Sequence, residues 1–162
     1  MTFEKTEILP NISVRPATRA DVPAIVRLLA DDMLGSQRER SEDPLPQSYY
    51  DAFERVAANP HVELVVAEMQ NEIIGVLQLD FISGLSFQGG TRAQIESVRV
   101  DSRHRGQGIG KALFRWSIEF ARQMGCYVVQ LTTNAERKDA HRFYTDLGFK
   151  PSHVGMKLFL QK

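Results

Sequence analysis

The segment RHRGQGIGKALF, Arg103–Phe114, holds three glycines at alternating positions between two arginines and an apolar, helix-like run. Backbone N–H groups at the start of a helix have no intrahelical partner and carry the positive end of the helix dipole. Glycines let that backbone approach a bulky anion closely. The segment therefore predicts a phosphate-binding turn that opens a helix.

The spacing of the glycines excludes two common phosphate loops. A nucleoside-triphosphate loop requires G-x-x-x-x-G-K-[ST]. The stretch from Gly106 to Lys111 is one residue too short, and Ala112 stands where the metal-binding hydroxyl belongs. A dinucleotide fold requires G-x-G-x-x-G in its first strand–helix unit and an acidic residue about 20 positions later. Gly110 comes one position early, and the next strand ends in Thr132-Thr133-Asn134.

The segment and the residues after it resemble the GNAT superfamily of N-acetyltransferases. That family carries Q/R-x-x-G-x-G/A at the start of its central helix, and Arg105–Gly110 matches every fixed position. Asn134, Ala140, Phe143-Tyr144 and Leu147–Phe149 follow in the order of the family's later N…A…FY…LGF pattern. The resemblance implies that the bound phosphate is the pyrophosphate of acetyl-coenzyme A.

The resemblance also implies a set of residues that contact acetyl-CoA. Backbone near Val98 would face the thioester carbonyl, and pantetheine would pair with the exposed strand as an added strand does. Asn134 would cap the following helix or reach pantetheine. The expected contacts are Val98, Arg99, Val100, Arg105, Gly106, Gln107, Gly108, Ile109, Gly110, Lys111 and Asn134.

Amine attack on a thioester poses two proton-transfer problems. The amine is an ammonium ion at neutral pH and must lose a proton, and the leaving thiolate is helped by receiving one. Glu96 occupies the family position of the base, acting directly or through water, with Asp80 as its substitute. Tyr144 matches the family tyrosine near the sulfur and is the expected acid. A non-catalytic acyl-CoA-binding or sensor module is the alternative function.

The strand TRAQIESVRV, residues 91–100, changes phase along its length. Ala93 and Ile95 are apolar at odd positions, whereas Val98 and Val100 are apolar at even ones. A regular strand keeps one parity, so a β-bulge between Ile95 and Val98 is indicated. Burial of both faces would also explain the pattern.

The remaining chain predicts one domain over residues 12–162 after a loose lead-in over 1–11. Periodicity predicts an α/β (α+β) fold, a mixed central sheet of about six to seven strands flanked by helices, as in the GNAT fold. The strands are expected within residues 12–16, 62–69, 73–82, 91–100, 126–133 (largely buried) and 156–160. The helices are expected within residues 22–33, 49–58, 108–124 and 137–147, the last ended by Gly148.

Charge composition limits the classes of binding partner that are expected. Lys plus Arg and Asp plus Glu both number 20, so no net charge favours nucleic acid or an acidic membrane. Basic residues gather at Arg99, Arg103, His104, Arg105 and Lys111, a patch suited to a small polyanion.

Cys126 is the only cysteine, and no histidine has a zinc-type partner at short spacing, so no metal is expected. A cytoplasmic location is expected, since no signal peptide or transmembrane run is visible. The expected substrate is a small-molecule or peptide amine. A homodimer is expected because Met156–Leu160 forms an apolar strand needing cover.

Overall fold

A computed structural model describes residues 3–31 and 35–160 of the chain. Its principal helices are α1 (Val22–Ala30), α2 (Gln47–Ala57), α4 (Ile109–Gln123) and α5 (Lys138–Asp146), with a single turn, α3 (Ser86–Gly89). Its strands are β1 (Thr6–Leu9), β2 (Ile12–Pro16), β3 (Val62–Met69), β4 (Glu72–Ser83), β5 (Thr91–Val100) and β6 (Val128–Leu131).

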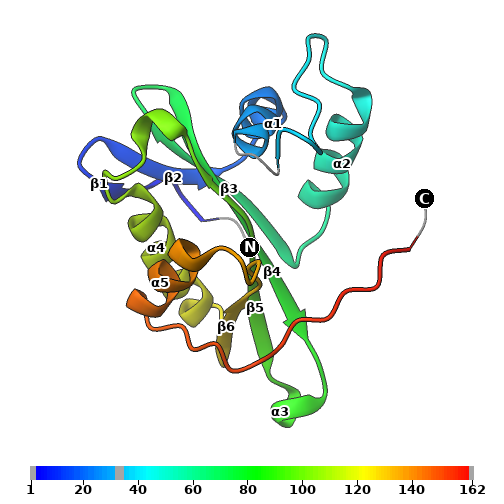
Figure 1. Ribbon diagram of the computed structural model, residues 1–162, viewed down its shortest axis with the longest axis vertical. Coiled ribbons are helices and arrows are strands. Elements are labelled where there is room, and N and C mark those ends of the chain that lie inside the picture. Colours follow the sequence, from blue (N-terminus) through cyan, green and yellow to red (C-terminus); the bar gives the residue numbers. More distant parts are fainter. Residues whose placement is uncertain (1–2, 32–34, 161–162) are drawn as a thin grey trace.

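The six strands form one curled sheet in the order β1-β2-β3-β4-β5-β6 (Figure 1). Neighbours pair antiparallel, except that β5 and β6 are parallel. The crossover between β5 and β6 contains α4, as a parallel connection requires. The predicted mixed six-to-seven-stranded sheet flanked by helices is confirmed.

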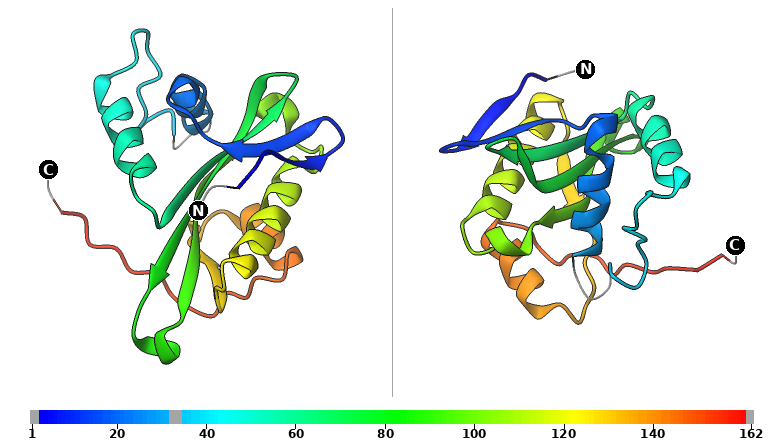
Figure 2. Two further views of the ribbon diagram at one scale, coloured as in Figure 1. Left: turned by 180° about the vertical axis from the view of Figure 1, so that it is seen from behind. Right: turned by 90° about the horizontal axis from the view of Figure 1, so that it is seen from above.

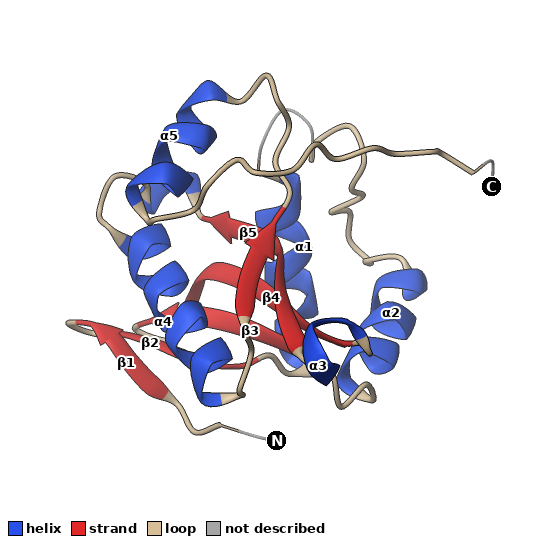
Figure 3. Cartoon of the chain, turned by 90° about the horizontal axis from the view of Figure 1, so that it is seen from below, coloured by secondary structure: helices blue, strands red, loops and turns tan. Residues whose placement is uncertain are grey.

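Helices cover both faces of the sheet (Figures 2 and 3). On one face, Leu113, Phe114 and Phe120 of α4 pack against buried residues of β4 and β5, with α5 beside them. On the other face, Ile25 and Leu28 of α1 form a smaller cluster with residues of β3 and β4. The core thus holds β4 and β5 between α4 and α1.

Local signals in the sequence explain where α1 begins and where α5 ends. Thr18 and Asp21 form a capping box before α1, with the Thr18 N–H donating to Asp21 Oδ2 over 2.7 Å. After α5, Gly148 has φ 92°, and the Phe149 N–H donates to the Tyr144 carbonyl at 3.0 Å. The predicted C′ glycine is therefore confirmed.

Three expectations about segments differ from the structure. Thr6–Leu9 of the expected lead-in form β1, because their backbone pairs with β2. Residues 126–133 are not largely buried, since β6 is the last strand of the sheet and Tyr127 and Val128 are exposed. Met156–Leu160 do not form a strand, because the segment pairs with no part of the described chain. The end of the expected first helix, Met33, lies outside the described residues.

Candidate active site

The predicted β-bulge is present in β5. Val76 of β4 pairs with Arg99, whereas Gln78 pairs with Glu96, so one residue of β4 faces two of β5. Ser97, inside the bulge, has φ 55°. The extra residue lets Ala93 and Ile95 before it, and Val98 and Val100 after it, reach the same core beside α4. The phase change therefore reflects a bulge and not burial of both faces.

The bulge coincides with a separation of β5 from β6. The parallel pairing covers only Arg92–Ile95 and Val128–Leu131. Beyond Ile95, within the part of the chain that the structure describes, β5 has no strand neighbour on its β6 side. A wedge between β5 and β6 therefore opens at Glu96, with half-buried Val98 and Val100 along one edge.

The glycine loop lies between the end of β5 and α4. Gly106 and Gly108 both have φ 80°, the left-handed region, and Gly108 is the N-cap of α4. A Cβ built on either glycine would meet no heavy atom within 4 Å, so the space above the loop is open. The first intrahelical hydrogen bond joins the Ala112 N–H to the Gly108 carbonyl, at 3.0 Å. The N–H groups of Ile109–Lys111 precede it and remain for an anion.

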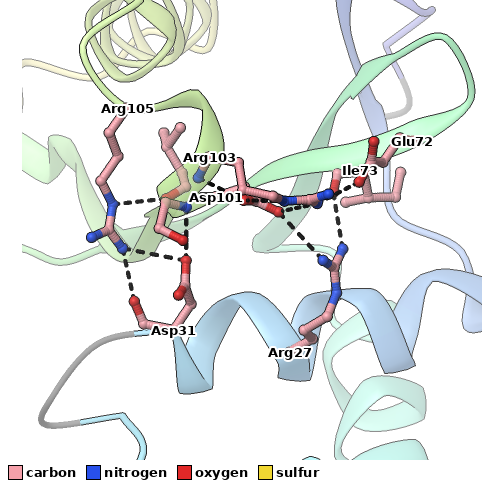
Figure 4. Close-up of polar contacts among 9 residues, drawn as sticks. Arg27, Asp31, Glu72, Ile73, Asp101, Arg103 and Arg105 are labelled. Carbon is pink, nitrogen blue, oxygen red and sulfur yellow. Dashed lines mark hydrogen bonds and ion pairs between the residues drawn. The ribbon is translucent and has the colours of Figure 1, made fainter.

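The expected basic patch is smaller in the structure than in the sequence. Arg103 turns away from the loop, and its guanidinium binds Asp101 and Glu72 (Figure 4). Arg105 donates to the Asp31 carbonyl at 2.7 Å and to the Val100 carbonyl at 3.3 Å. These contacts keep Arg105 beside the glycine loop, while Lys111 is exposed on the first turn of α4.

Asp101 is a buried carboxylate that ties the loop to α1. It is 3% exposed and accepts hydrogen bonds from the backbone and side chain of Arg103 and from Arg27 of α1. Hydrogen bonds from Arg103 hold the pKa of Asp101 well below its usual range. Asp31, at the end of α1, accepts the Ser102 N–H at 2.8 Å. Contacts of Arg27 and of Asp31 therefore join α1 and its end to the segment from Asp101 to Arg105 (Figure 4).

Glu96 lies at the mouth of the wedge, on the face of the sheet that α1 covers. Glu96 pairs with Gln78 of β4, and Gln78 lies on the same face of the sheet as Val76, two residues away. Val76 packs on α1. Glu96 is exposed, and its Oε1 accepts a hydrogen bond from Gln94 Nε2 at 2.9 Å. Gln94 in turn accepts from Gln130 Nε2 of β6 at 2.7 Å. The expected base is thus held by a chain of amides that crosses the β5–β6 pairing.

Gln78 and Asp80 extend this polar row onto β4. Gln78 Nε2 donates to both carboxylate oxygens of Asp80 at 3.1 Å. Asp80 faces Gln94, and Gln78 faces Glu96 across the ladder. Sequence reasoning identified Asp80 and Glu96 but missed the glutamines. The available signal was a pair of polar residues two positions apart in each strand, Gln78 with Asp80 and Gln94 with Glu96, which marks a polar stripe on one face.

Tyr144 approaches the same region from the opposite face. Its ring packs against Phe114 and Phe149, at centroid distances of 5.4 and 6.2 Å. Burial raises the pKa of Tyr144, and the nearby positive charges of Arg137 and Arg99 oppose that shift. Tyr144 packs against the same core cluster as Val98 and Val100, which line the β5 edge of the wedge.

Asn134 does not cap α5, contrary to one of its two expected roles. Its Oδ1 accepts the Glu136 N–H at 2.9 Å, while the N-cap of α5 is Arg137. Asn134 therefore stabilises the turn between β6 and α5. The side chain of Ile109 is buried in the core, so its backbone is the part available for the predicted contact with acetyl-CoA.

Among the described residues, no group of three or more His, Cys, Asp or Glu residues is arranged to hold a metal ion. No described helix is both long enough and apolar enough to cross a membrane.

A curled mixed sheet, a bulged strand that parts from its parallel neighbour, and a glycine loop opening the central helix together define an acyl-CoA-dependent acyltransferase architecture. Residues 23–149 match the model of the acetyltransferase (GNAT) family, so the chain belongs to that family. The N-acetyltransferase activity of the family is accordingly assigned to this chain, with acetyl-CoA as the family's co-substrate.

Two named relatives and one solved structure each match most of the chain. The aminoalkylphosphonate N-acetyltransferase of Salmonella typhimurium is 30% identical over 149 residues, which cover 92% of each chain. The N-alpha-acetyltransferase RimI of Mycobacterium tuberculosis is 29% identical, over 90% of this chain and 82% of its own length. A solved structure described as a transcriptional regulator from Bacillus halodurans C-125 is 49% identical, with a TM-score of 0.89 over 92% of this chain and 99% of its own.

Proposed function

We propose that this chain transfers the acetyl group of acetyl-CoA to a primary amine of a small molecule or peptide, by direct attack in a ternary complex. The observation that carries the proposal is the wedge between β5 and β6. Glu96 borders the wedge on one face of the sheet, and Tyr144 packs on the other face, against the same core cluster as Val98 and Val100 of the wedge. A proton acceptor and a proton donor are thus available on opposite sides of one opening.

The glycine loop and the open edge of β5 fit the co-substrate. Backbone N–H groups of Ile109–Lys111, with Arg105 and Lys111, bind the pyrophosphate through hydrogen bonds and charge. The open edge of β5 at Val98 and Val100 pairs with the amide groups of pantetheine. The backbone N–H of Val98 stabilises the oxyanion that forms at the thioester carbonyl.

Two residues of the chain move protons in the proposed reaction. Glu96 takes a proton from the ammonium, directly or through water, so that the amine nitrogen can form a bond to the acetyl carbon. The bond between that carbon and sulfur then breaks, and Tyr144 gives its phenolic proton to the departing thiolate. The nitrogen loses its second proton to solvent as the amide forms, and solvent returns a proton to the Tyr144 phenolate. Asp80 is the alternative acceptor, because it lies beside Gln78 and Gln94 in the same polar row.

The polar row also supports a cationic acceptor. Asp80 and Glu96 contribute two carboxylates to one face near the wedge, which favours an ammonium group over a neutral or anionic one. The Salmonella relative, by its name, acetylates aminoalkylphosphonates, and it matches this chain over nearly its whole length. We therefore propose small aminoalkyl compounds as the first substrates to test, with peptide amines as the second group.

A non-catalytic acyl-CoA sensor is the competing function. The solved chain that is 49% identical carries the description of a transcriptional regulator. A sensor needs the glycine loop but has no use for a base at Glu96 or an acid at Tyr144. Steady turnover with any amine excludes a purely sensory role.

The test is release of free thiol from acetyl-CoA in the presence of an amine panel, with mass spectrometry of the product. Aminoalkylphosphonates, polyamines and peptide N-termini form the panel, and each is compared with its N-methylated or neutral analogue. Thiol release that depends on the amine supports the proposal. Binding of acetyl-CoA without turnover on any amine contradicts it. We also propose that two copies of the chain associate, because the apolar side chains of Met156–Leu160 are exposed.

A further inference from the structure

Asp31 stands where its charge brings no benefit to its own helix. It is the C-cap of α1, and a carboxylate at a helix C-terminus faces the negative end of the helix dipole. It also lies beside the loop where the phosphates of acetyl-CoA are proposed to bind, and a negative charge there repels an anionic ligand. A favourable contact that offsets both effects is therefore expected at Asp31.

Both acceptor groups of Asp31 bind the segment that leads into the glycine loop. Its Oδ2 accepts the Ser102 N–H at 2.8 Å, and its carbonyl accepts a hydrogen bond from Arg105 Nη2 at 2.7 Å. The same Nη2 lies 3.4 Å from Oδ2, so the carboxylate and the carbonyl share one end of the guanidinium (Figure 4). Asp31 is thus joined to residues that follow it by 71 and 74 positions in the chain.

These contacts determine which part of Arg105 remains for a ligand. A guanidinium has five N–H donors in a rigid planar fork. Nε donates to the Val100 carbonyl at 3.3 Å, and Nη2 donates to Asp31. Within the part of the chain that the structure describes, Nη1 has no such contact, and the Arg105 side chain is 52% exposed. Because Arg105 directly precedes Gly106, its Nη1 is available to an anion held by the loop.

We infer that Asp31 is a positioning residue of the acetyl-CoA site. It holds the Nε–Nη2 edge of Arg105 against the end of α1, so that Nη1 is directed to the pyrophosphate. The Ser102 N–H holds the Asp31 carboxylate in the orientation that this role requires. The inference rests on the proposed binding of the pyrophosphate at the glycine loop, and it adds a residue from a distant part of the chain to that site.

The physical effect of Asp31 is pre-organisation of the arginine. A free arginine side chain loses rotamer freedom when it binds an anion, whereas Arg105 is already held in one arrangement. Charge alone acts in the opposite direction, because removal of a carboxylate near a phosphate strengthens binding, on the order of threefold for unit charges roughly 6 Å apart in water. The direction in which the CoA affinity changes when Asp31 is removed therefore distinguishes positioning from simple repulsion.

The turn before the glycine loop has a second support that does not involve Asp31. Asp101 is 3% exposed, its Oδ1 accepts the Arg103 N–H at 3.0 Å, and its carbonyl accepts the His104 N–H at 2.9 Å. Arg27 of α1 also binds Asp101, at 3.3 Å, so a connection between α1 and this segment remains without Asp31. An Asp31 variant is therefore expected to fold, and CoA binding is the property expected to change.

The first experiment measures the Kd for CoA by calorimetric titration of the full chain. Asp31→Ala removes the carboxylate and keeps the main-chain carbonyl, and its Kd is expected to rise about 5- to 10-fold. Glu72→Gln is the matched control, because it also removes one negative charge, from a side chain that binds Arg103, which turns away from the loop. The Kd of this control is expected to stay the same or to fall slightly. An unchanged or lower Kd in Asp31→Ala overturns the inference.

The second experiment tests whether Asp31 acts through Arg105. Arg105→Met keeps an apolar stem but removes the donors, and Asp31→Ala/Arg105→Met completes a double-mutant cycle. Positioning predicts that Asp31→Ala causes at most about a twofold further rise in the Kd for CoA once Arg105→Met is present. An equal rise in both backgrounds, or an Arg105→Met variant that binds CoA like wild type, overturns the inference. A wild type that binds no CoA would contradict the proposed function as well, whereas the other outcomes leave CoA binding by the chain intact.

Discussion

Gly108 and Gly110 stand two residues apart, and the structure gives them different roles. Gly108 has φ 80° and ψ 0°, and nothing lies within 4 Å of a Cβ built there. Gly110 lies inside α4, and a Cβ there would be 3.7 Å from Phe143 and 3.8 Å from Val100. We therefore compare Gly108→Ala with Gly110→Ala, which add the same methyl group to different surroundings.

The magnitude follows from the backbone. A non-glycine residue in the left-handed region costs roughly 1–2 kcal/mol. A chain of this size loses about 2–4 °C in Tm per kcal/mol, so Gly108→Ala is expected to melt about 2–8 °C lower. Its methyl group projects into the open space above the loop, where the pyrophosphate is proposed to bind. Loss of one charge-assisted hydrogen bond, worth about 1.5–3 kcal/mol, raises the Kd for CoA about 10- to 100-fold.

Gly110→Ala is the matched control. Its methyl group makes ordinary contacts with Phe143 and Val100, and alanine is about 1 kcal/mol better than glycine within a helix. Stability is expected to stay the same or to rise slightly, with the Kd for CoA changed less than threefold or so. Calorimetric titration with CoA and thermal melting give both quantities. Equal losses of CoA affinity in the two variants would refute the proposed orientation of the loop.

Three further predictions concern protons and the loop. Tyr144→Phe retains the ring packing but removes the phenolic proton, so kcat is expected to fall about 10²- to 10⁴-fold with an unchanged Kd for CoA. Because burial raises the pKa of Tyr144, wild-type kcat is expected to stay level up to the ordinary phenol range near pH 10. A decline of kcat at lower pH would argue against Tyr144 as the acid. Glu96→Gln is expected to lower kcat/KM most at acidic pH and to recover partly as free amine becomes abundant, and a defect that pH cannot relieve would move the base role to Asp80. The pKa of Asp101 is lowered in the folded protein, so this carboxylate stabilises the fold above its ordinary pKa of 3.8, and the stabilisation is lost as pH falls below that value. Asp101→Asn is expected to flatten the acid dependence of the unfolding free energy and to cost about 1–3 kcal/mol near neutral pH. An acid dependence like that of wild type would contradict the role of this carboxylate.

Local patterns in the sequence predicted much of the fold and part of the site. The bulge in β5 followed from the parity of Ile95 and Val98, because alternation in a strand is a local property. The glycine loop followed from the spacing of Gly106, Gly108 and Gly110. Both features depend only on residues close in sequence. The catalytic assignments of Glu96 and Tyr144 came from the family resemblance and stay predictions.

Side-chain contacts between residues far apart in the sequence could not be predicted from local sequence patterns. Arg103 was counted in the phosphate patch because its pairing with Glu72, 31 residues away, has no sequence signature. The amide chain from Gln130 to Glu96 was missed for the same reason, since it depends on the pairing of β5 with β6. The alternation in Met156–Leu160 predicted a strand, but the segment forms none in the structure, because alternation alone does not supply a partner strand.

The most direct test of the account is amine-dependent cleavage of acetyl-CoA by wild type and by the variant Glu96→Gln/Tyr144→Phe. Thiol release and the mass of the amine product are followed for one amine that serves as substrate, and CoA binding is measured in parallel. The account predicts an N-acetylated product with wild type, and a large loss of turnover with nearly unchanged CoA affinity in the double variant. Wild-type turnover by a double variant that still binds CoA would contradict it, because acetyl transfer would then proceed without the two proton-transfer groups that border the wedge.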